Sequence, residues 1–453
     1  MLARKLIAAA GNAGGDLSYW VARVSPGSVT LQTRPRAMVN ETNQTIVGRL
    51  WYSGYSWFFR LDYDGGVDAA SSTTDISEHP NGGQGALVAV GSSDYTVNQY
   101  DYGTMRAYDI SSLSTTTIQG RQFANGEVTG FSNYPPTKQM AVFDGSQTDD
   151  RIVMVDGGYY DYGDGTYQPR VGAWTFNVTD NLVDSTLVRA LNDNTSGYGV
   201  RYLQVASGSS GKFVISYTEP GDDKTGFATY NNGATPSFSN FKHSPSTANM
   251  KNFALRIDEN DKLCAVTCVS NQHWFWRGTT AGTYTPNVYY SFNAYSAIGN
   301  VISASIDSTG NMYVLGYVSS FSGYRLLKFN TSNTVEWVLQ LANSSVSPAI
   351  SGEGADINVQ SIDGQDFLLI SLVYQPENTN QYPVYVIKAP LDFANYTGTY
   401  GNIVVSSVSF SPTITTNTPT NVDVGSAISA NISRSNPTAS TTSRSLSTSV
   451  TDI

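Results

Sequence analysis

Residues 306–341 constrain the fold of this chain more than any other stretch. They hold three short apolar runs rich in β-branched and aromatic residues, at 312–317, 324–329 and 335–341. Residues of these types favour strands because they fit a pleated, half-buried surface. Clusters of Gly, Ser and Asn separate the runs, and these residue types permit tight reversals. The segment therefore predicts a small antiparallel meander.

Six other stretches repeat this pattern less clearly. A meander with two apolar faces cannot bury both alone, so it requires copies of itself on either side. The spacing of roughly 50 residues is within the range of propeller blades. The copies span residues 44–67, 85–110, 150–178, 211–230, 257–278 and 362–390. Together the seven units predict an all-β chain folded as a β-propeller, with seven blades favoured and extended arms at both ends.

Composition and length agree with one all-β body. The chain has 29 Tyr and 41 Gly among 453 residues, and no long stretch keeps the apolar period of an amphipathic helix. A propeller accommodates this length because blades add around the ring rather than thickening one core. We expect an N-terminal docking arm and lead-in strand over residues 1–41, the propeller over 42–398, and a Ser/Thr-rich extended segment over 399–453.

The N-terminal segment begins MLARKLIAAAGNAGG, with Arg4 and Lys5 before a short apolar run. The run from Leu6 to Ala10 is shorter than the seven to fifteen residues of a secretory h-region, so we expect the segment to be retained. Arg4, Lys5 and Leu6 are its candidate assembly contacts. No window approaches the ~20 apolar residues of a membrane span, so no membrane insertion is expected.

The C-terminal segment changes character after residue 410. Residues 401–410 alternate as a strand, whereas 411–453 are rich in Ser, Thr and Asn, with few charges. Two interpretations remain open: a disordered tail, or an extended chain that orders by pairing with the edge of a neighbouring subunit. Under the second, the sparse β-branched residues are the candidate assembly contacts, namely Val422, Val424, Ile428 and Ile432.

The charge balance limits the partners. The formal net charge is -10, and Lys and Arg never form a cluster larger than two adjacent residues. Duplex nucleic acid is therefore not an expected partner, because its binding requires many phosphate contacts from basic side chains. An acidic, Tyr-rich surface suits glycans, which stack on aromatic faces and donate hydroxyls to Asp and Asn. The same composition is equally typical of a soluble extracellular or virion β protein.

Two clusters on strand-like sequence are candidate sites of chemistry. Cys264 and Cys268 would lie about 13 Å apart on one strand, beyond the ~7 Å Cα limit for a disulfide, so we expect buried free thiols. The run His273, Trp274, Trp276 and Arg277 could form an aromatic and guanidinium platform for a ligand. The alternative is an apolar strand of a blade, which this run fits better.

The most acidic aromatic stretch lies at residues 155–170. It offers Asp156, Asp161 and Asp164 beside Tyr159 and Tyr160. Two carboxylates brought together by a fold suffice for a glycosidase, and oxygen-rich turns can hold Ca²⁺. The spacing matches no EF-hand, however, and a solvated hairpin loop is the plainer interpretation. Because the sequence has no nucleophile-elbow, zinc-peptidase or phosphate-loop motif, we expect no enzyme, no metal and no cofactor.

Residues 306–341 resemble the bacterial seven-bladed propeller repeat with the consensus D-x-x-G-N-x-Y-V-x-G, followed by a strand ending in K-x-[DN] and a [VT]-x-W strand. The resemblance implies the propeller fold and assigns these positions to the scaffold. The matching residues are Asp307, Gly310, Asn311, Tyr313, Val314, Gly316, Lys328, Asn330 and Trp337.

The first dozen residues separately resemble the MLxRKLLxAAG start of tail and fibre-like structural proteins of tailed phages, particularly those of marine cyanobacteria. This resemblance implies a virion protein placed in the tail, at the nozzle or a fibre base, and attached through its N-terminus. Its partners would be other virion proteins, neighbouring copies of itself, and a glycan of the host surface. The alternatives are a capsid-bound fibre or decoration protein, and a carbohydrate-active enzyme or lectin on a propeller scaffold.

Overall fold

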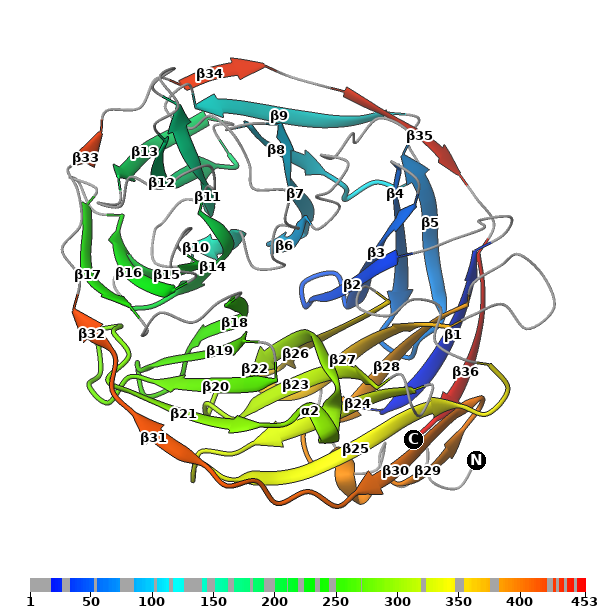
Figure 1. Ribbon diagram of the computed structural model, residues 1–453. Coiled ribbons are helices and arrows are strands. Elements are labelled where there is room, and N and C mark those ends of the chain that lie inside the picture. The colour runs from blue at the N-terminus through cyan, green and yellow to red at the C-terminus, as the bar shows by residue number, and fades with distance from the viewer. Residues whose placement is uncertain are drawn as a thin grey trace.

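The computed structural model consists almost entirely of antiparallel strands arranged as seven blades around a ring (Figure 1). The predicted all-β propeller with seven blades is confirmed. Helix in the described residues is limited to the single turn α2 (Tyr295–Ile298) and the 3₁₀ turn η3 (Phe393–Asn395). The structure describes residues 18–26, 33–52, 55–73, 85–101, 104–113, 117–125, 141–144, 151–161, 167–179, 182–190, 200–209, 211–218, 224–232, 237–243, 250–269, 271–318, 323–346, 354–374, 383–421, 427–428, 432–435, 438–443 and 446–453.

Each of the first six blades is a meander of four consecutive strands. Blade 1 contains β2 (Thr33–Asn40), β3 (Thr45–Tyr52), β4 (Tyr55–Asp62) and β5 (Val67–Thr73), and blade 2 contains β6 (Ala86–Val90), β7 (Ser93–Asp101), β8 (Thr104–Asp109) and β9 (Thr117–Asn125). Blade 3 contains β10 (Ala141–Asp144), β11 (Arg151–Asp161), β12 (Tyr167–Asn177) and β13 (Leu182–Ala190), and blade 4 contains β14 (Arg201–Ser207), β15 (Lys212–Thr218), β16 (Thr225–Asn231) and β17 (Ser237–His243). Blade 5 contains β18 (Lys251–Ile257), β19 (Leu263–Val269), β20 (Gln272–Arg277) and β21 (Val288–Asn293), and blade 6 contains β22 (Asn300–Ile306), β23 (Met312–Val318), β24 (Gly323–Phe329) and β25 (Val335–Asn343).

Blade 7 closes the ring with strands from both ends of the chain. Its first three strands are β26 (Ala355–Ile362), β27 (Gln365–Val373) and β28 (Val384–Pro390). The fourth is β1 (Trp20–Pro26), which pairs antiparallel with β28 from Trp20↔Lys388 to Val24↔Val384. The fold therefore holds the N-terminal and C-terminal parts of the chain together through backbone hydrogen bonds.

The C-terminal segment runs around the outside of the ring and adds a strand to the edge of every blade (Figure 1). We call residues 403–452 the belt. It visits blades 6, 5, 4, 3, 2 and 1 in turn and ends on blade 7, where its last strand covers β1. The belt strands are β30 (Ile403–Val408), β31 (Thr415–Asn417), β32 (Thr420–Asn421), β33 (Ala427–Ile428), β34 (Ile432–Ser435), β35 (Thr438–Ser443) and β36 (Leu446–Asp452).

The belt is anchored most extensively at its two ends. Strand β30 makes six register pairs with β25, and β36 makes seven with β1. Between them, β32 and β33 make only two register pairs each. The short strand β29 (Gly398–Tyr400) also pairs with β30 and occupies its other edge.

The structure places both ends of the chain differently from the expectation based on sequence. Strands β1 and β2 precede residue 42, the expected start of the propeller, yet both belong to blades. The C-terminal segment is an edge-adding strand, as expected, but in the described residues it adds to blades of its own chain rather than to a neighbouring subunit. A strand edge offers only backbone groups, so the sequence of an added strand does not specify which edge it joins.

The seven sequence units correspond to the seven blades. In the reference unit, the apolar runs 312–317, 324–329 and 335–341 are strands β23, β24 and β25. Most units omitted the innermost strand: β2, β10 and β14 lie before their units, and β18, β22 and β26 end at the first residue of theirs. These strands lie nearest the axis of the ring (Figure 1).

The consensus residues of the reference unit hold a turn together through hydrogen bonds; they do not form a ligand site in the described residues. The Asp307 carboxylate accepts hydrogen bonds from the Asn311 backbone N–H at 2.8 Å, from the Thr309 hydroxyl at 2.8 Å and from the Tyr313 hydroxyl at 3.1 Å. Gly310 has φ +94°, and a Cβ there would lie 3.1 Å from the Arg277 guanidinium. A glycine is therefore required both by the backbone and by the close approach.

The turns between first and second strands interlock around one face of the ring. The Ser308 N–H donates to the Asp366 carboxylate at 2.7 Å, and the Glu259 N–H donates to the Ser308 carbonyl at 2.7 Å. The Asp363 N–H donates to Glu41 at 3.1 Å. These bonds link blade 5 to blade 6, blade 6 to blade 7, and blade 7 to blade 1. These bonds therefore help to fix blades 5, 6, 7 and 1 relative to one another on this face.

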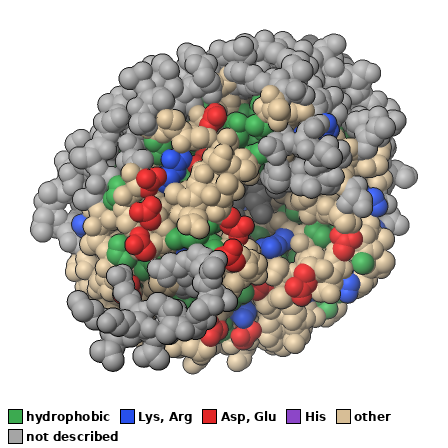
Figure 2. Space-filling view, turned by 180° about the vertical axis from the view of Figure 1, so that it is seen from behind, with side chains coloured by type: hydrophobic (Ala, Val, Ile, Leu, Met, Phe, Trp, Pro, Cys, Tyr) green, Lys and Arg blue, Asp and Glu red, His purple; other side chains and the backbone are tan. Residues whose placement is uncertain are grey.

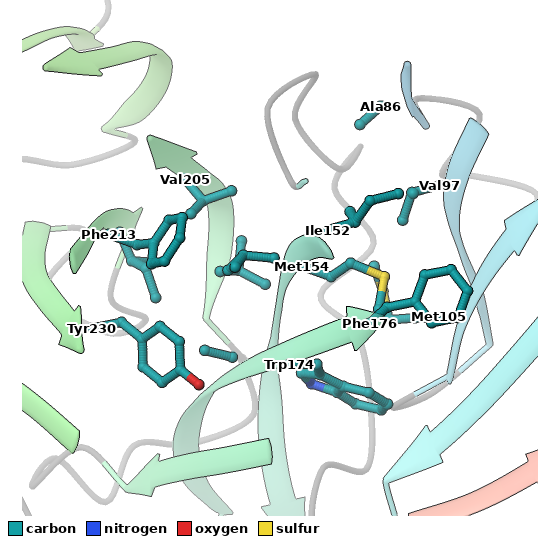
Figure 3. Packing of buried hydrophobic residues seen from close by; sticks show 14 of the residues in the cluster. Ala86, Val97, Met105, Ile152, Met154, Trp174, Phe176, Val205, Phe213 and Tyr230 are labelled. Atoms are coloured by element: carbon teal, nitrogen blue, oxygen red, sulfur yellow. The ribbon is translucent and has the colours of Figure 1, made fainter. Parts of the chain in front are cut away.

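The apolar core lies between the blades. Figure 3 shows one cluster in which Met105 and Val97 of blade 2, Met154 and Trp174 of blade 3, and Phe213 of blade 4 pack together. Five further clusters of buried apolar residues fill other parts of the ring. Because each blade buries both faces against its neighbours, the ring behaves as one packed unit.

Candidate functional site

The hairpin formed by β11 and β12 extends beyond the rest of its blade. Both strands have 11 residues, more than any other strand. The inner strand β10 pairs only with residues 151–154 of β11, and the outer strand β13 pairs with β12 only from Arg170 onward. The hairpin continues past both, to the pair Asp161↔Tyr167. We call residues 157–161 and 167–170 the blade 3 tip.

The neighbouring blade supports the base of this tip. The Gly158 carbonyl accepts a hydrogen bond from the Val200 N–H at 3.1 Å. A Cβ on Gly157 would lie 2.7 Å from the Leu203 side chain and 3.1 Å from the Val200 carbonyl. The chain entering blade 4 thus approaches the tip so closely that only glycine fits. The base of the tip is therefore held in place by contacts with blade 4.

A stacked cation and aromatic ring form the described centre of the blade 3 tip. The Arg170 guanidinium carbon lies 4.2 Å from the centroid of the Tyr160 ring. An Arg170 N–H also donates to the Gln168 side-chain oxygen at 3.4 Å. Arg170 is buried, whereas Tyr159 and Tyr160 are partly exposed. A cation held against an aromatic ring in this way is worth about 0.5–2 kcal/mol and fixes the ring orientation.

This tip brings together part of the acidic aromatic stretch singled out in the sequence. Tyr159, Tyr160 and Asp161 lie on β11, close to its end, and Asp156 lies in the same strand opposite Gly172. Asp164 lies outside the described residues. In the part of the chain that the structure describes, no group of three or more His, Cys, Asp and Glu residues is placed to hold a metal ion. What sequence reasoning missed here is Arg170, which pattern alone marks as an ordinary strand residue.

The tip lies at the end of the ring that carries the long connections. In an up-and-down meander the connection between second and third strands lies at the same end as the connection between blades. Connections between blades span from six residues, at 27–32, to fifteen, at 126–140. At the opposite end the connections between first and second strands are shorter, from two residues, at 91–92 and 363–364, to six, at 145–150. Long connections on a rigid scaffold commonly carry recognition, so this end is the better candidate for contacts with a partner.

The second predicted cluster lies in the interior of blade 5. His273, Trp274 and Trp276 are buried on β20, with Trp276 fully inaccessible and His273 only 1% exposed. Trp274 stacks on Tyr289 at 4.6 Å between ring centroids, and His273 stacks on Phe292 at 6.3 Å. An exposed ligand platform is therefore not formed, and the alternative of an apolar blade strand is the observed one. The cause is the alternation of β20, which directs its side chains into the two flanking blade interfaces.

Arg277, the last residue of β20, links blade 5 to blade 6 through hydrogen bonds. Its guanidinium donates to the Gly310 carbonyl at 2.8 Å, to the Asn330 carbonyl at 3.0 Å and to the Asn333 side chain at 2.8 Å. All three acceptors belong to turns of blade 6. Arg277 therefore stabilises the interface of blades 5 and 6.

Burial of His273 makes the stability of the protein depend on pH. Burial lowers the pKa of His273 to about 4, and the nearby Asn271 backbone offsets this only in part. A histidine with a lowered pKa stabilises the fold above its unfolded pKa of about 6.5 and loses this contribution as the pH falls towards the folded pKa. Between pH 7.5 and pH 5 we expect the wild type to lose about 2 kcal/mol of unfolding free energy through this group.

The measurement is urea unfolding at pH 7.5 and pH 5 for the wild type and for His273→Gln. The variant retains a polar side chain of similar size but does not titrate, so its loss over this pH range should be smaller by about 2 kcal/mol. Equal losses for the two proteins would show that the histidine is not buried in its neutral form.

The two cysteines are as the sequence predicted. Cys264 and Cys268 lie on β19, are buried, and are free thiols. Burial raises the pKa of Cys264 to about 11, and the nearby Arg277 only partly offsets this. Because the thiolate is the reactive form, neither residue is a candidate nucleophile.

The predicted assembly contacts are only partly described. Ile428 lies on β33 opposite Val188, and Ile432 lies on β34 opposite Asn125. Arg4, Lys5, Leu6, Val422 and Val424 lie outside the described residues. The structure thus gives Ile428 and Ile432 a place in the belt.

The described surface has a mixed charge pattern. On the side of the ring seen in Figure 2, acidic side chains are spread over the described surface and basic side chains stand among them rather than forming a continuous patch. Among the described residues, no helix is long and apolar enough to cross a membrane.

Comparisons with known proteins give structural neighbours only. No family model matches the chain, and no curated protein matches it. A mutant of AofleA from Arthrobotrys oligospora superposes with a TM-score of 0.39 at 9% identity, covering 88% of this chain and 94% of that one. The WD40 domain of SCAP from fission yeast gives 0.34 at 10% identity, covering 81% and 98%. A bifunctional GH43-CE protein of Bacteroides eggerthii gives 0.30 at 10% identity, covering 92% and 63%.

Proposed function

We propose that this chain is a structural protein of a tailed-phage particle, associated with the tail at the nozzle or a fibre base. In this role the propeller is a rigid body held in the particle and displayed for assembly or for contact with the host surface. The role is not catalytic. The other virion proteins are its partners.

The observation that carries this proposal is the belt. The described parts of residues 403–452 contain strands that cover the outer edges of all seven blades. A protein that must persist outside the cell benefits from such a covering, because exposed strand edges invite aggregation and local opening. A strand that closes every blade increases the resistance of the displayed body to unfolding.

The position of the chain ends supports attachment at one point. The Ile453 N–H donates to the Tyr19 carbonyl at 2.9 Å, and the Tyr19 ring lies 6.3 Å from the Tyr396 ring. The first described residues therefore lie beside the last residue, on blade 7 (Figure 1). An N-terminal docking arm would hold the body by the rim of this blade and leave the opposite rim free.

The decisive experiment locates the protein in purified particles. Cryo-electron microscopy, with a nanobody against the propeller as a marker, should place it at the tail. A density on the capsid would favour the decoration-protein alternative. Absence from purified particles would end the proposal.

The blade 3 tip supports host contact as part of this role. It combines a projecting hairpin, a fixed aromatic ring and a buried guanidinium beneath it. Aromatic anchors of this kind often dominate the affinity of an interface, at 2 kcal/mol or more in the strongest cases. We expect Tyr160→Ala to weaken binding of the purified protein to cyanobacterial cells by roughly fivefold to thirtyfold.

The matched control is Tyr295→Ala. Tyr295 is 44% exposed on α2, in a connection between blades at the same end of the ring. It should bind cells as the wild type does. Equal binding by all three proteins, each with an unchanged melting temperature, would remove the blade 3 tip from the proposed function.

A further inference from the structure

The last belt strand leaves an open edge on the outside of blade 7. The sheet order ends β28, β1, β36, and no strand pairs with the far side of β36 in the described part of the chain. In an antiparallel pair, every second residue of an edge strand directs its N–H and C=O away from its neighbour. Seven residues of β36 are paired with β1, so an edge of this length faces outward.

This edge differs from the other belt strands. The outer edge of β30 is occupied by β29. Strands β31, β32 and β33 have three, two and two residues, and shortness itself blunts an edge. Strand β35 is divided between blades, since residues 441–443 pair with β5 and residues 438–440 pair with β9. Strand β36 alone combines seven residues with one continuous partner.

Strand β36 also lacks the devices that protect an edge. Residues 446–453 read LSTSVTDI and contain no Pro, Lys or Arg. Val450 is 38% exposed, one of three large apolar residues exposed among the described residues. Natural edge strands commonly carry Lys, Pro or a bulge that prevents pairing with another chain. Their absence here favours pairing.

The sequence of this strand is complementary to itself. In an antiparallel pair centred on Ser449, Val450 of one copy lies opposite Thr448 of the other. The single carboxylate, Asp452, lies opposite Leu446, so the two negative charges stand at opposite ends of the pair. The like-charge clash that would oppose pairing is thereby avoided.

We propose that β36 is a homodimer interface, at which two copies pair their β36 strands antiparallel about a two-fold axis near Ser449. The five-stranded sheet of blade 7 then continues across the axis into the same sheet of the second copy. The fold already contains such continuity, because β35 joins blades 1 and 2 into one ten-stranded sheet. The interface is isologous, as closed two-fold pairing requires.

A single pair of edge strands forms a small interface, so the isolated dimer is weak. Small interfaces of this class have dissociation constants on the order of micromolar or above. Sedimentation equilibrium of the full chain over a wide concentration range measures it. The dimer should appear as the concentration rises, independently of any particle.

The test uses matched lysine substitutions. Val450→Lys places two ammonium groups near the two-fold axis and should weaken the dimer at least tenfold. Tyr295→Lys is the control, because Tyr295 is 44% exposed on α2, in the connection between blades 5 and 6 and outside blade 7. It should leave dimerisation unchanged. Both variants must retain the melting temperature of the wild type, since a change would report damage to the fold.

Disulfide crosslinking tests the register in which the two β36 strands pair. The native cysteines are buried, so an introduced surface cysteine is the accessible thiol of the described residues. Under mild oxidation Ser449→Cys should form a disulfide-linked dimer, and Tyr295→Cys should not. A monomer at all concentrations, together with no crosslink from cysteines placed singly at 447 to 451, overturns the inference. The proposed virion role would stand in that case, because it is tested separately, by the location of the protein in purified particles.

Discussion

Deletion of residues 446–453 should lower the melting temperature more than any other small truncation of this chain. The deletion removes β36, which makes seven register pairs with β1. Strand β1 would then be held in the ring by β28 alone, through five register pairs. Because each backbone hydrogen bond contributes about 0.5–1.5 kcal/mol net, the expected loss of unfolding free energy is on the order of 5 kcal/mol.

The effect is large because β1 closes the ring. A propeller whose last blade opens exposes the apolar faces of the blades on both sides, including buried Trp20, Ala22 and Val24. Differential scanning calorimetry should therefore show a melting temperature lower by roughly 5–10 °C. Hydrogen exchange should show faster exchange for the amides of β1 than for those of β23, which lies inside a complete blade.

The control for the truncation is Ile428→Pro. It interrupts β33, which makes only two register pairs with blade 3, so its effect on the melting temperature should be small. A truncated protein that melts within about 1 °C of the wild type would contradict a role of β36 in closure. Equal effects of the two variants would instead show that the belt acts as one unit.

Loss of Asp94 should be the most damaging single substitution that we can identify. Asp94 is fully buried, and its carboxylate accepts from the Arg60 guanidinium at 2.6 Å and from the Asn40 amide at 2.7 Å. Arg60 and Asn40 belong to blade 1 and Asp94 belongs to blade 2. Asp94→Ala removes the buried charge partner of the Arg60 guanidinium and leaves only the exposed Asp68 nearby, which costs about 3–5 kcal/mol. Urea unfolding at pH 7 measures the loss.

The neighbouring carboxylate provides a control on the same arginine. Asp68 lies 3.8 Å from Arg60, but its side chain is 42% exposed. Exposed ion pairs contribute about 0–1 kcal/mol, so Asp68→Ala should change stability little. Replacing both buried partners, as Arg60→Met with Asp94→Leu, should recover part of the loss, because no buried charge remains unpaired. A loss below about 1 kcal/mol for Asp94→Ala would show that the pair is hydrated in solution.

Much of the fold could be predicted because its signals are local. The apolar runs and turn clusters of residues 306–341 correspond to β23, β24 and β25, and the seven units correspond to seven blades. The strand assignment of Cys264 and Cys268 followed from the same alternation. The interior position of His273 was favoured by its apolar neighbours, although its exposed fraction could not be derived from them.

The candidate site was less predictable. Tyr160 was singled out for its acidic and aromatic surroundings, but Arg170 ten residues later joins it only through the β11 and β12 register. The projection of this hairpin depends on where β10 and β13 stop pairing, which is a property of other strands.

By itself, the sequence determined the strands, the turns and the number of blades, since period-two alternation and turn chemistry act between residues close along the chain. The tertiary structure decided which edge each end of the chain would join. It placed β1 in blade 7 and led the belt around every blade, because strand edges bind through backbone groups that are the same for every residue except proline. Which strands pair at an edge is therefore set by the closure of the ring and by how far the chain can reach. Neither of these can be derived from a local sequence pattern.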